Sequence, residues 1–146
     1  MTEEARPAAL PTSPHRLVNP DTLPPPKGYS HAVVAAAGTI VALAGQTGYR
    51  ADGTIVEDLV GQFDQAAWNV AEALRAAGGS PEHLVQLLMF VTDVAEYRAR
   101  REEIGEAYRR HLGRHYPAMA LLGVVELVDP RTKVELVGMA VVPTGS

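Results

Sequence analysis

The sequence predicts an α+β fold in which two helices cover one face of a β-sheet. Two observations support this fold class. Apolar residues recur every three or four positions over residues 58–77, as in an amphipathic helix, whereas residues 84–92 are apolar at nearly every position, as in a strand covered on both sides. With further strand-like runs toward both ends of the chain, the expected order of elements is β-β-α-β-α-β-β.

The composition is that of an ordinary globular domain, with 47% hydrophobic and 21% charged residues among 146. A formal net charge of -4 argues against nucleic-acid binding through phosphate neutralisation. The absence of cysteine excludes disulfides, thiolate metal ligands and a cysteine nucleophile. We find no export signal, and the longest apolar stretch, residues 32–44, is too short to span a bilayer. A cytoplasmic protein without membrane contact is therefore expected.

Seven of the eleven prolines lie within the first 27 residues, and proline-rich segments rarely pack as regular structure. Residues 1–14 are therefore expected to form a disordered tail, which would precede a single domain at residues 15–146. A proline-motif ligand for another protein is the alternative interpretation of this tail. A short extended segment is expected at residues 15–18.

The first elements of the domain are two β-rich runs, residues 30–37 and 39–44, with Gly38 between them. This pattern predicts a β-hairpin in which Gly38 supplies the turn. Gly45 and Gln46 then end the second strand.

A helix is predicted over residues 58–77, ended by Gly78-Gly79. Its apolar stripe comprises Leu59, Phe63, Ala66, Val70, Leu74 and Ala77. Trp68 lies about 140° away from Phe63 around the helix. It is either a surface residue or an interface anchor.

The remaining elements alternate between strand and helix. Ser80-Pro81 begins a short helix, residues 84–92 form the buried strand, and residues 93–112 form a second long helix that stops at Gly113. Two strands, residues 119–127 and 133–142, complete the sheet.

Most familiar catalytic motifs are missing. The sequence has no phosphate-binding glycine loop, no HExxH and no GxSxG, and its five histidines lack metal-ligand spacing, so no metal is expected. Ser30 and His31 are adjacent in a predicted strand, where neighbouring side chains point to opposite faces, so they should not act together.

Two carboxylates stand where an apolar residue is expected, Glu126 and Glu135. A carboxylate among valines and leucines is costly to bury unless it is paired or used. Glu135 either orients a water in a pocket wall or reaches solvent beside Lys133. Glu126 sits where its strand ends, and a structural role is the simpler interpretation.

Six short segments follow one another along the chain in an order that is informative when they are taken together. They are Gly28–Val33, Ala44–Gln46, Ala76–Gly78, Thr92–Val94, Tyr116–Ala118 and Val134–Glu135. This ordered set resembles the reactive intermediate/imine deaminase (Rid, YjgF-type) family over about residues 15–143. The resemblance implies a fold like the bacillus-type chorismate mutase and a homotrimer with three clefts between its subunits. It also implies hydrolysis of enamines and imines, such as 2-aminoacrylate, to keto acids and ammonia, without a cofactor.

The resemblance also assigns roles to individual positions. The tyrosine that lines the family's cleft falls on Tyr29, and the glutamate that holds the water falls on Glu135. The arginine that binds the substrate carboxylate falls on Met119, and a contributing serine falls on Ala44. Methionine cannot make a charge-assisted bond to a carboxylate, which implies a loss of about 1.5–3 kcal/mol in binding.

We therefore expect a cleft adapted to a less acidic or differently anchored substrate. The residues expected to contact it are Met119, Ala44, Gly45, Leu121 and Arg101, with Arg50 or Arg131 of a neighbouring subunit as other substitutes for the lost arginine. Three functions stay open at this point: a divergent imine or enamine hydrolase, a non-catalytic trimer that binds a small metabolite or a protein partner, and a cyclisation or tautomerisation on the same scaffold.

Overall fold

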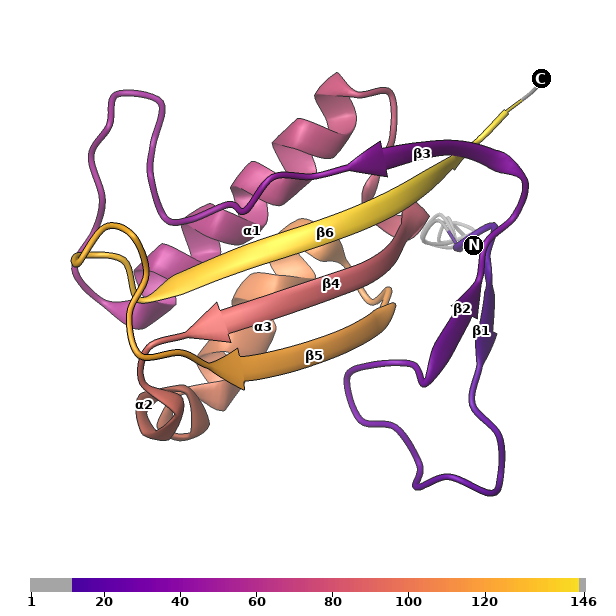
Figure 1. The fold of residues 1–146 in the computed structure, drawn as a ribbon, viewed down its shortest axis with the longest axis horizontal. Coiled ribbons are helices and arrows are strands. Elements are labelled where there is room, and N and C mark those ends of the chain that lie inside the picture. The colour runs from indigo at the N-terminus through magenta and orange to yellow at the C-terminus, as the bar shows by residue number, and fades with distance from the viewer. Residues whose placement is uncertain (1–11, 145–146) are drawn as a thin grey trace, which may run out of the picture.

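The computed structural model describes residues 12–144. A four-stranded sheet with the order β3-β6-β4-β5 forms its centre, and β1 and β2 form a separate two-stranded ribbon (Figure 1). The elements are β1 (Arg16–Val18), β2 (Ala32–Val34), β3 (Gly38–Ala42), α1 (Leu59–Ala76), the 3-10 helix η1 (Pro81–His83), β4 (Leu84–Val91), α2 (Val94–Ala99), α3 (Arg101–Leu112), β5 (Ala118–Gly123) and β6 (Val134–Pro143).

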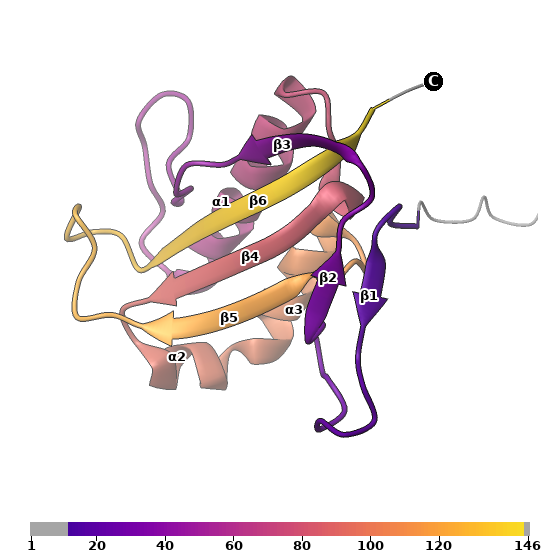
Figure 2. The same ribbon diagram turned by 45° about the vertical axis from the view of Figure 1, so that its right-hand side comes forward.

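Both long helices, α1 and α3, lie on the same face of the sheet, and the two views agree on this (Figures 1 and 2). The strands β4 and β5 are parallel, which requires the crossover that α2 and α3 provide, whereas β6 is antiparallel to both β3 and β4. The predicted fold class, a sheet with helices on one face, is confirmed.

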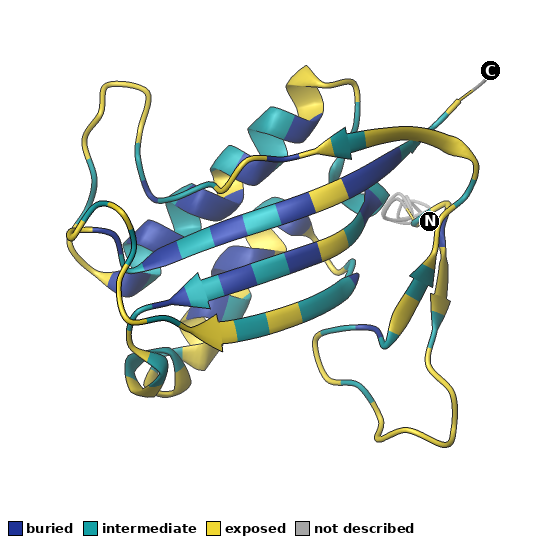
Figure 3. Ribbon diagram, viewed as in Figure 1, coloured by how far each residue is buried: buried dark blue, intermediate teal, exposed yellow. Residues whose placement is uncertain are grey.

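The hydrophobic core lies between the helices and the sheet. The predicted stripe of α1 is buried from Leu59 to Leu74, with Phe63 and Leu74 at most 1% exposed, and alternate residues of β4 and β6 face it (Figure 3). Ala77, the last predicted member, is exposed beyond the end of the helix. Asp58 caps α1, because its carboxylate accepts a hydrogen bond of 3.0 Å from the Gly61 amide. No helix of the described residues is both long and apolar enough to cross a bilayer.

The predicted hairpin around Gly38 is wrong. The strand β2 pairs with β1, and β3 pairs with β6, where Ile40 lies opposite Val141. Gly38 does not have a positive φ. It is instead a point of close approach, because a Cβ there would lie 2.3 Å from the Val142 carbonyl oxygen. The glycine thus marks strand packing rather than a turn.

Two predicted element boundaries also change. The helix expected over residues 93–112 is divided at Arg100, whose φ of -112° and ψ of 19° are not helical. The strand expected over residues 119–127 ends at Gly123, because its partner β4 ends at Val91 and offers no further backbone to pair with. Most of the predicted tail, residues 1–11, lies outside the described residues.

Candidate functional site

Glu135 stands on the face of the sheet that the helices leave open. Its neighbours along β6, Val134 and Leu136, are both 0% exposed and point into the core, so the alternation of the strand turns Glu135 the other way. Phe90 is its register partner on β4, and Leu122 of β5 pairs with Phe90 in turn. The carboxylate is half-buried in an apolar row that crosses the sheet.

Gly45 leaves the space that the Glu135 carboxylate fills. A Cβ on Gly45 would lie 2.0 Å from Oε1 of Glu135, so any larger residue would displace the carboxylate. Gln46, the next residue, exchanges two backbone hydrogen bonds of 2.7 and 2.8 Å with Leu136, and these bonds hold the two segments side by side. Ala44 is exposed just before this contact.

A buried glutamine of α1 ties down the segment that leads into β6. Gln62 is 0% exposed, and its Nε2 donates hydrogen bonds of 2.9 Å to the carbonyls of Val56 and Arg131. Its Oε1 accepts a bond of 2.7 Å from the Lys133 amide. The entry of the chain into β6, two residues before Glu135, is therefore fixed by one side chain.

An asparagine on the same helix holds the segment after Gly45 in place by hydrogen bonds to its backbone. The Nδ2 of Asn69 donates bonds of 2.9 Å to the carbonyls of Thr47 and Tyr49. Neither Asn69 nor Gln62 was a predicted site residue. The signal that identifies them is a pair of amide side chains two helical turns apart, at the border of the apolar stripe.

Met119 and Leu121 lie on the opposite face of the sheet from Glu135. Both pack against the core, and Met119 pairs in register with Leu87, which is 0% exposed. Met119 also lines a hollow of about 350 Å³ between β5 and the helices α2 and α3, and Arg101 lines the same hollow. The structure thus brings Met119 and Arg101 together but separates them from Glu135 within one chain.

Tyr29 lies close to the start of β5. Its neighbour Ser30 donates two hydrogen bonds there, from its amide to the Pro117 carbonyl at 2.9 Å and from its hydroxyl to the Tyr116 carbonyl at 2.8 Å. The Tyr29 ring meets His31 edge-on, with 5.3 Å between centroids. Gly28, which precedes Tyr29, lines the hollow that contains Met119.

The other predicted candidates lie elsewhere. Arg131 pairs with Asp129 at 2.9 Å and also donates to the Tyr49 hydroxyl at 3.0 Å. Arg50 lines a different hollow, of about 310 Å³, with Trp68, which is 46% exposed. Glu126 is exposed in the loop after β5.

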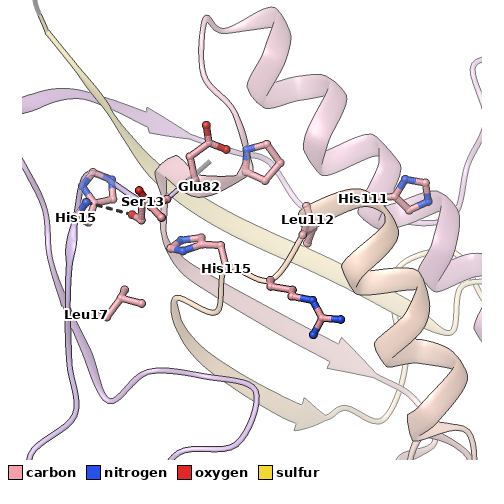
Figure 4. Close-up of a pocket in the computed structure, with 11 residues that line it drawn as sticks. Ser13, His15, Leu17, Glu82, His111, Leu112 and His115 are labelled. Carbon is pink, nitrogen blue, oxygen red and sulfur yellow. Dashed lines mark hydrogen bonds between the residues drawn. The ribbon is translucent and has the colours of Figure 1, made fainter. Parts of the chain in front are cut away.

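Another hollow, of about 490 Å³, lies between the N-terminal segment, η1 and the end of α3 (Figure 4). Of the three histidines that line it, His15 and His115 bond backbone groups, and His111 bonds the Asp64 carboxylate at 2.9 Å. His15 bonds the carbonyl of His83 through Nε2 and accepts from the Ala36 amide through Nδ1, both at 3.0 Å, and His115 bonds the Leu84 carbonyl at 2.7 Å. Burial lowers the pKa of His115, which favours its neutral form. The two bonds of His15 attach the N-terminal segment to the rest of the domain.

Within residues 12–144, no three histidine or carboxylate side chains are grouped so that they could hold a metal ion.

Comparisons with known proteins agree with the fold and the order of segments. The model of the family described as Endoribonuclease L-PSP matches residues 20–142. Among solved structures, the chain is similar to YyfB of the conserved Rid protein family from Yersinia pestis, at 32% identity and a TM-score of 0.79, covering 88% of this chain and 98% of that one. No curated protein matches the chain.

Two further structures are similar at lower identity. RidA from an Antarctic Psychrobacter is 25% identical with a TM-score of 0.63, covering 87% of this chain and 99% of that one. TdcF from E. coli, solved with bound serine, is 25% identical with a TM-score of 0.63, covering 86% and 94%. Since the family match spans most of the chain and the Yersinia structure is matched over nearly its whole length, this chain belongs to the Rid (YjgF, L-PSP) family.

Proposed function

We propose that the protein hydrolyses an imine, an enamine or a related small C–N compound, with Glu135 holding the attacking water. The observation that carries the proposal is the Glu135 carboxylate on an apolar face, seated against Gly45. None of the ion pairs among the described residues involves it, so it is available to a water or a substrate. The bound serine of TdcF supports a ligand of similar, amino-acid-like size.

The reaction balances without a cofactor. The oxygen of the water attacks the C=N carbon while the carboxylate of Glu135 accepts a proton from that water. The proton passes to the nitrogen and gives a carbinolamine. Its hydroxyl proton then moves to the nitrogen through the same carboxylate as the C=O bond forms and the C–N bond breaks, so that the products are a carbonyl compound and ammonia. An enamine enters this sequence after its carbon takes a proton and it becomes the imine. The family name Endoribonuclease L-PSP refers to RNA cleavage, but a net charge of -4 gives no general attraction to a phosphate backbone.

We further propose that the active unit is a homotrimer whose clefts lie between subunits. Glu135, Ala44 and Gly45 lie together, whereas Met119, Leu121 and Arg101 lie on the helix side and Tyr29 near the start of β5. Residues on opposite faces of one sheet can contact the same small molecule only if a second copy supplies one of the two sets. The open face also carries exposed apolar side chains, which favours self-association.

A single charge on the open face is expected to disrupt the trimer. Leu122 is 44% exposed at the β5 end of this apolar row, and Leu122→Asp would place a carboxylate in the proposed subunit contact. Light scattering should give three times the mass of the 15.6 kDa chain for the natural protein and a lower mass for the variant. Leu23→Asp, at a site 46% exposed outside the sheet, serves as the control and should keep the trimer mass. A natural protein that is monomeric would refute the shared cleft.

The proposed reaction is tested by ammonia release. Imines should be generated in the assay by a dehydratase or an amino-acid oxidase, so that 2-aminoacrylate and imines with larger apolar side chains are compared at equal concentration. We expect acceleration of the larger substrates and little acceleration of 2-aminoacrylate, because Met119 and Ala44 make the site apolar. Failure to accelerate any of them would reject the hydrolase.

Met119→Arg is expected to restore activity on the small, carboxylate-bearing 2-aminoacrylate. A charge-assisted bond contributes about 1.5–3 kcal/mol, which corresponds to a gain of roughly 10-fold to 100-fold in kcat/KM. Met119→Leu is the control, because it changes the shape of the side chain but adds no donor. A folded arginine variant with no gain would show that residue 119 does not contact this substrate.

A further inference from the structure

We propose that the hollow beneath β5 binds an organic acid with a bulky apolar body, and that Arg101 and Arg109 hold its carboxylate. The inference names the ligand class for the half of the proposed site that carries Met119, and to that extent it rests on the proposed function. It is argued from the lining of the hollow alone, and its test requires no turnover.

The inner wall of the hollow is apolar and aromatic. Tyr108 is 5% exposed and stacks on Tyr116 with ring centroids 5.4 Å apart, and the sulfur of Met119 lies 3.8 Å from the Tyr108 hydroxyl. Ile104 and Phe63 close the wall. A volume of about 350 Å³ is within the range of small-molecule sites. Such a wall fits a phenyl or branched aliphatic group rather than a small polar one.

The charged side chains that line the hollow all carry the same sign. They are Lys27, Arg101 and Arg109, and no carboxylate contributes to the lining. Among the ion pairs of residues 12–144, none includes these three cations, whereas Arg110, beside Arg109 on α3, pairs with Asp64. Because the chain as a whole is acidic, with a net charge of -4, this local excess of positive charge is not a property of the general surface.

Gly105 allows Arg109 to lie back along α3 at the hollow. A Cβ on Gly105 would come within 3.2 Å of Nη1 of Arg109, one helical turn further on. Tyr97 adds a hydroxyl to the same lining, and burial raises its pKa, so it stays protonated and can donate a hydrogen bond. The guanidinium groups are exposed at the opening of the hollow, and the aromatic wall is buried inside it. A matching ligand therefore has a negative charge at the opening and an apolar body inside.

Calorimetry with two probes tests the ligand class. 4-Phenylbutyrate has the proposed charge and body, and 4-phenylbutyramide has the same body without the charge. We expect the acid to bind about 10-fold to 100-fold more tightly than the amide, with the preference decreasing as salt is added. Inorganic phosphate, the third probe, should compete weakly because it lacks an apolar body. Equal affinity for acid and amide, or tighter binding of phosphate, would overturn the proposal.

Variants locate the site. Arg101→Gln combined with Arg109→Gln should abolish the preference for the acid, and both side chains are exposed, so the melting temperature should be preserved. Arg98→Gln is the matched control, because it removes an exposed arginine of α2 that does not line the hollow. A preference that survives in the double variant would contradict the proposal.

The binding experiment and the hydrolysis experiment can fail independently of each other. If the acid binds at this site but no imine is hydrolysed, the ligand class stands and the hydrolase falls. If imines are hydrolysed while the acid fails to bind, the assignment of this hollow is wrong and the reaction stands.

Discussion

Glu135→Gln should lower the turnover of ammonia release by about 10²-fold to 10⁴-fold, the usual contribution of a positioned acid–base group. Glutamine has nearly the same shape as glutamate but cannot accept a proton from the water. The residue 135 side chain should keep its close contact with Gly45, so the variant should fold and associate like the natural protein. The measurement is kcat for the best imine substrate, with mass and melting temperature recorded for the same preparation.

Two companion variants make the result specific. Glu126→Gln removes an exposed acid of the β5–β6 loop and should leave kcat unchanged. Gly45→Ala retains the Glu135 carboxylate but must displace it, since the new Cβ would lie 2.0 Å from Oε1, and it should lower kcat as well. Unchanged turnover in Glu135→Gln would remove this residue from the mechanism. It would favour a trimer that binds its ligand without converting it.

Gln62→Leu should reduce the free energy of unfolding by about 3 kcal/mol, measured by urea denaturation. Leucine fills a similar volume but leaves the carbonyls of Val56 and Arg131 and the amide of Lys133 without the partner that the fully buried Gln62 side chain supplies. Each buried polar group that loses its bond costs about 1–3 kcal/mol, and partial access of water limits the sum. Turnover should fall too, because the entry into β6 positions Glu135.

Gln65→Leu is the control for this substitution. Gln65 is only partly buried, and its amide bonds the side chain of Asn69 at 3.0 Å rather than a backbone group. We expect a loss below about 1 kcal/mol at this site. Similar losses at both positions would show that leucine itself, and not the three lost backbone contacts, destabilises the helix.

The elements with a strong local period were predictable. The helix at residues 58–77 and the strand at 84–92 appear as α1 and β4 with boundaries shifted by about one residue. The helical register of α1 also identified its buried stripe correctly, from Leu59 to Leu74. Such patterns depend on neighbouring residues alone, so no knowledge of the other elements is needed.

Strand pairing was not predictable in the same way. The two runs around Gly38 are both β-rich, and a hairpin is the simplest local solution. The longer strand β6, however, offers β3 a partner along its whole length, from Gly38 opposite Pro143 to Ala42 opposite Met139. Local preference cannot rank partners that are distant in the sequence.

The features of the candidate site likewise separate into those that local sequence predicts and those that depend on long-range packing. By itself, the sequence determined the family and the order of the main elements. It also places apolar residues at Met119 and Ala44, where the resemblance implies polar side chains. Only the tertiary structure decided that Glu135 rests against Gly45, that Gln62 and Asn69 hold the flanking segments, and that Met119 turns toward Arg101 on the other face. The physical reason is that residue types and periods are local, whereas the face a strand presents and the groups it meets depend on which distant segments pack beside it.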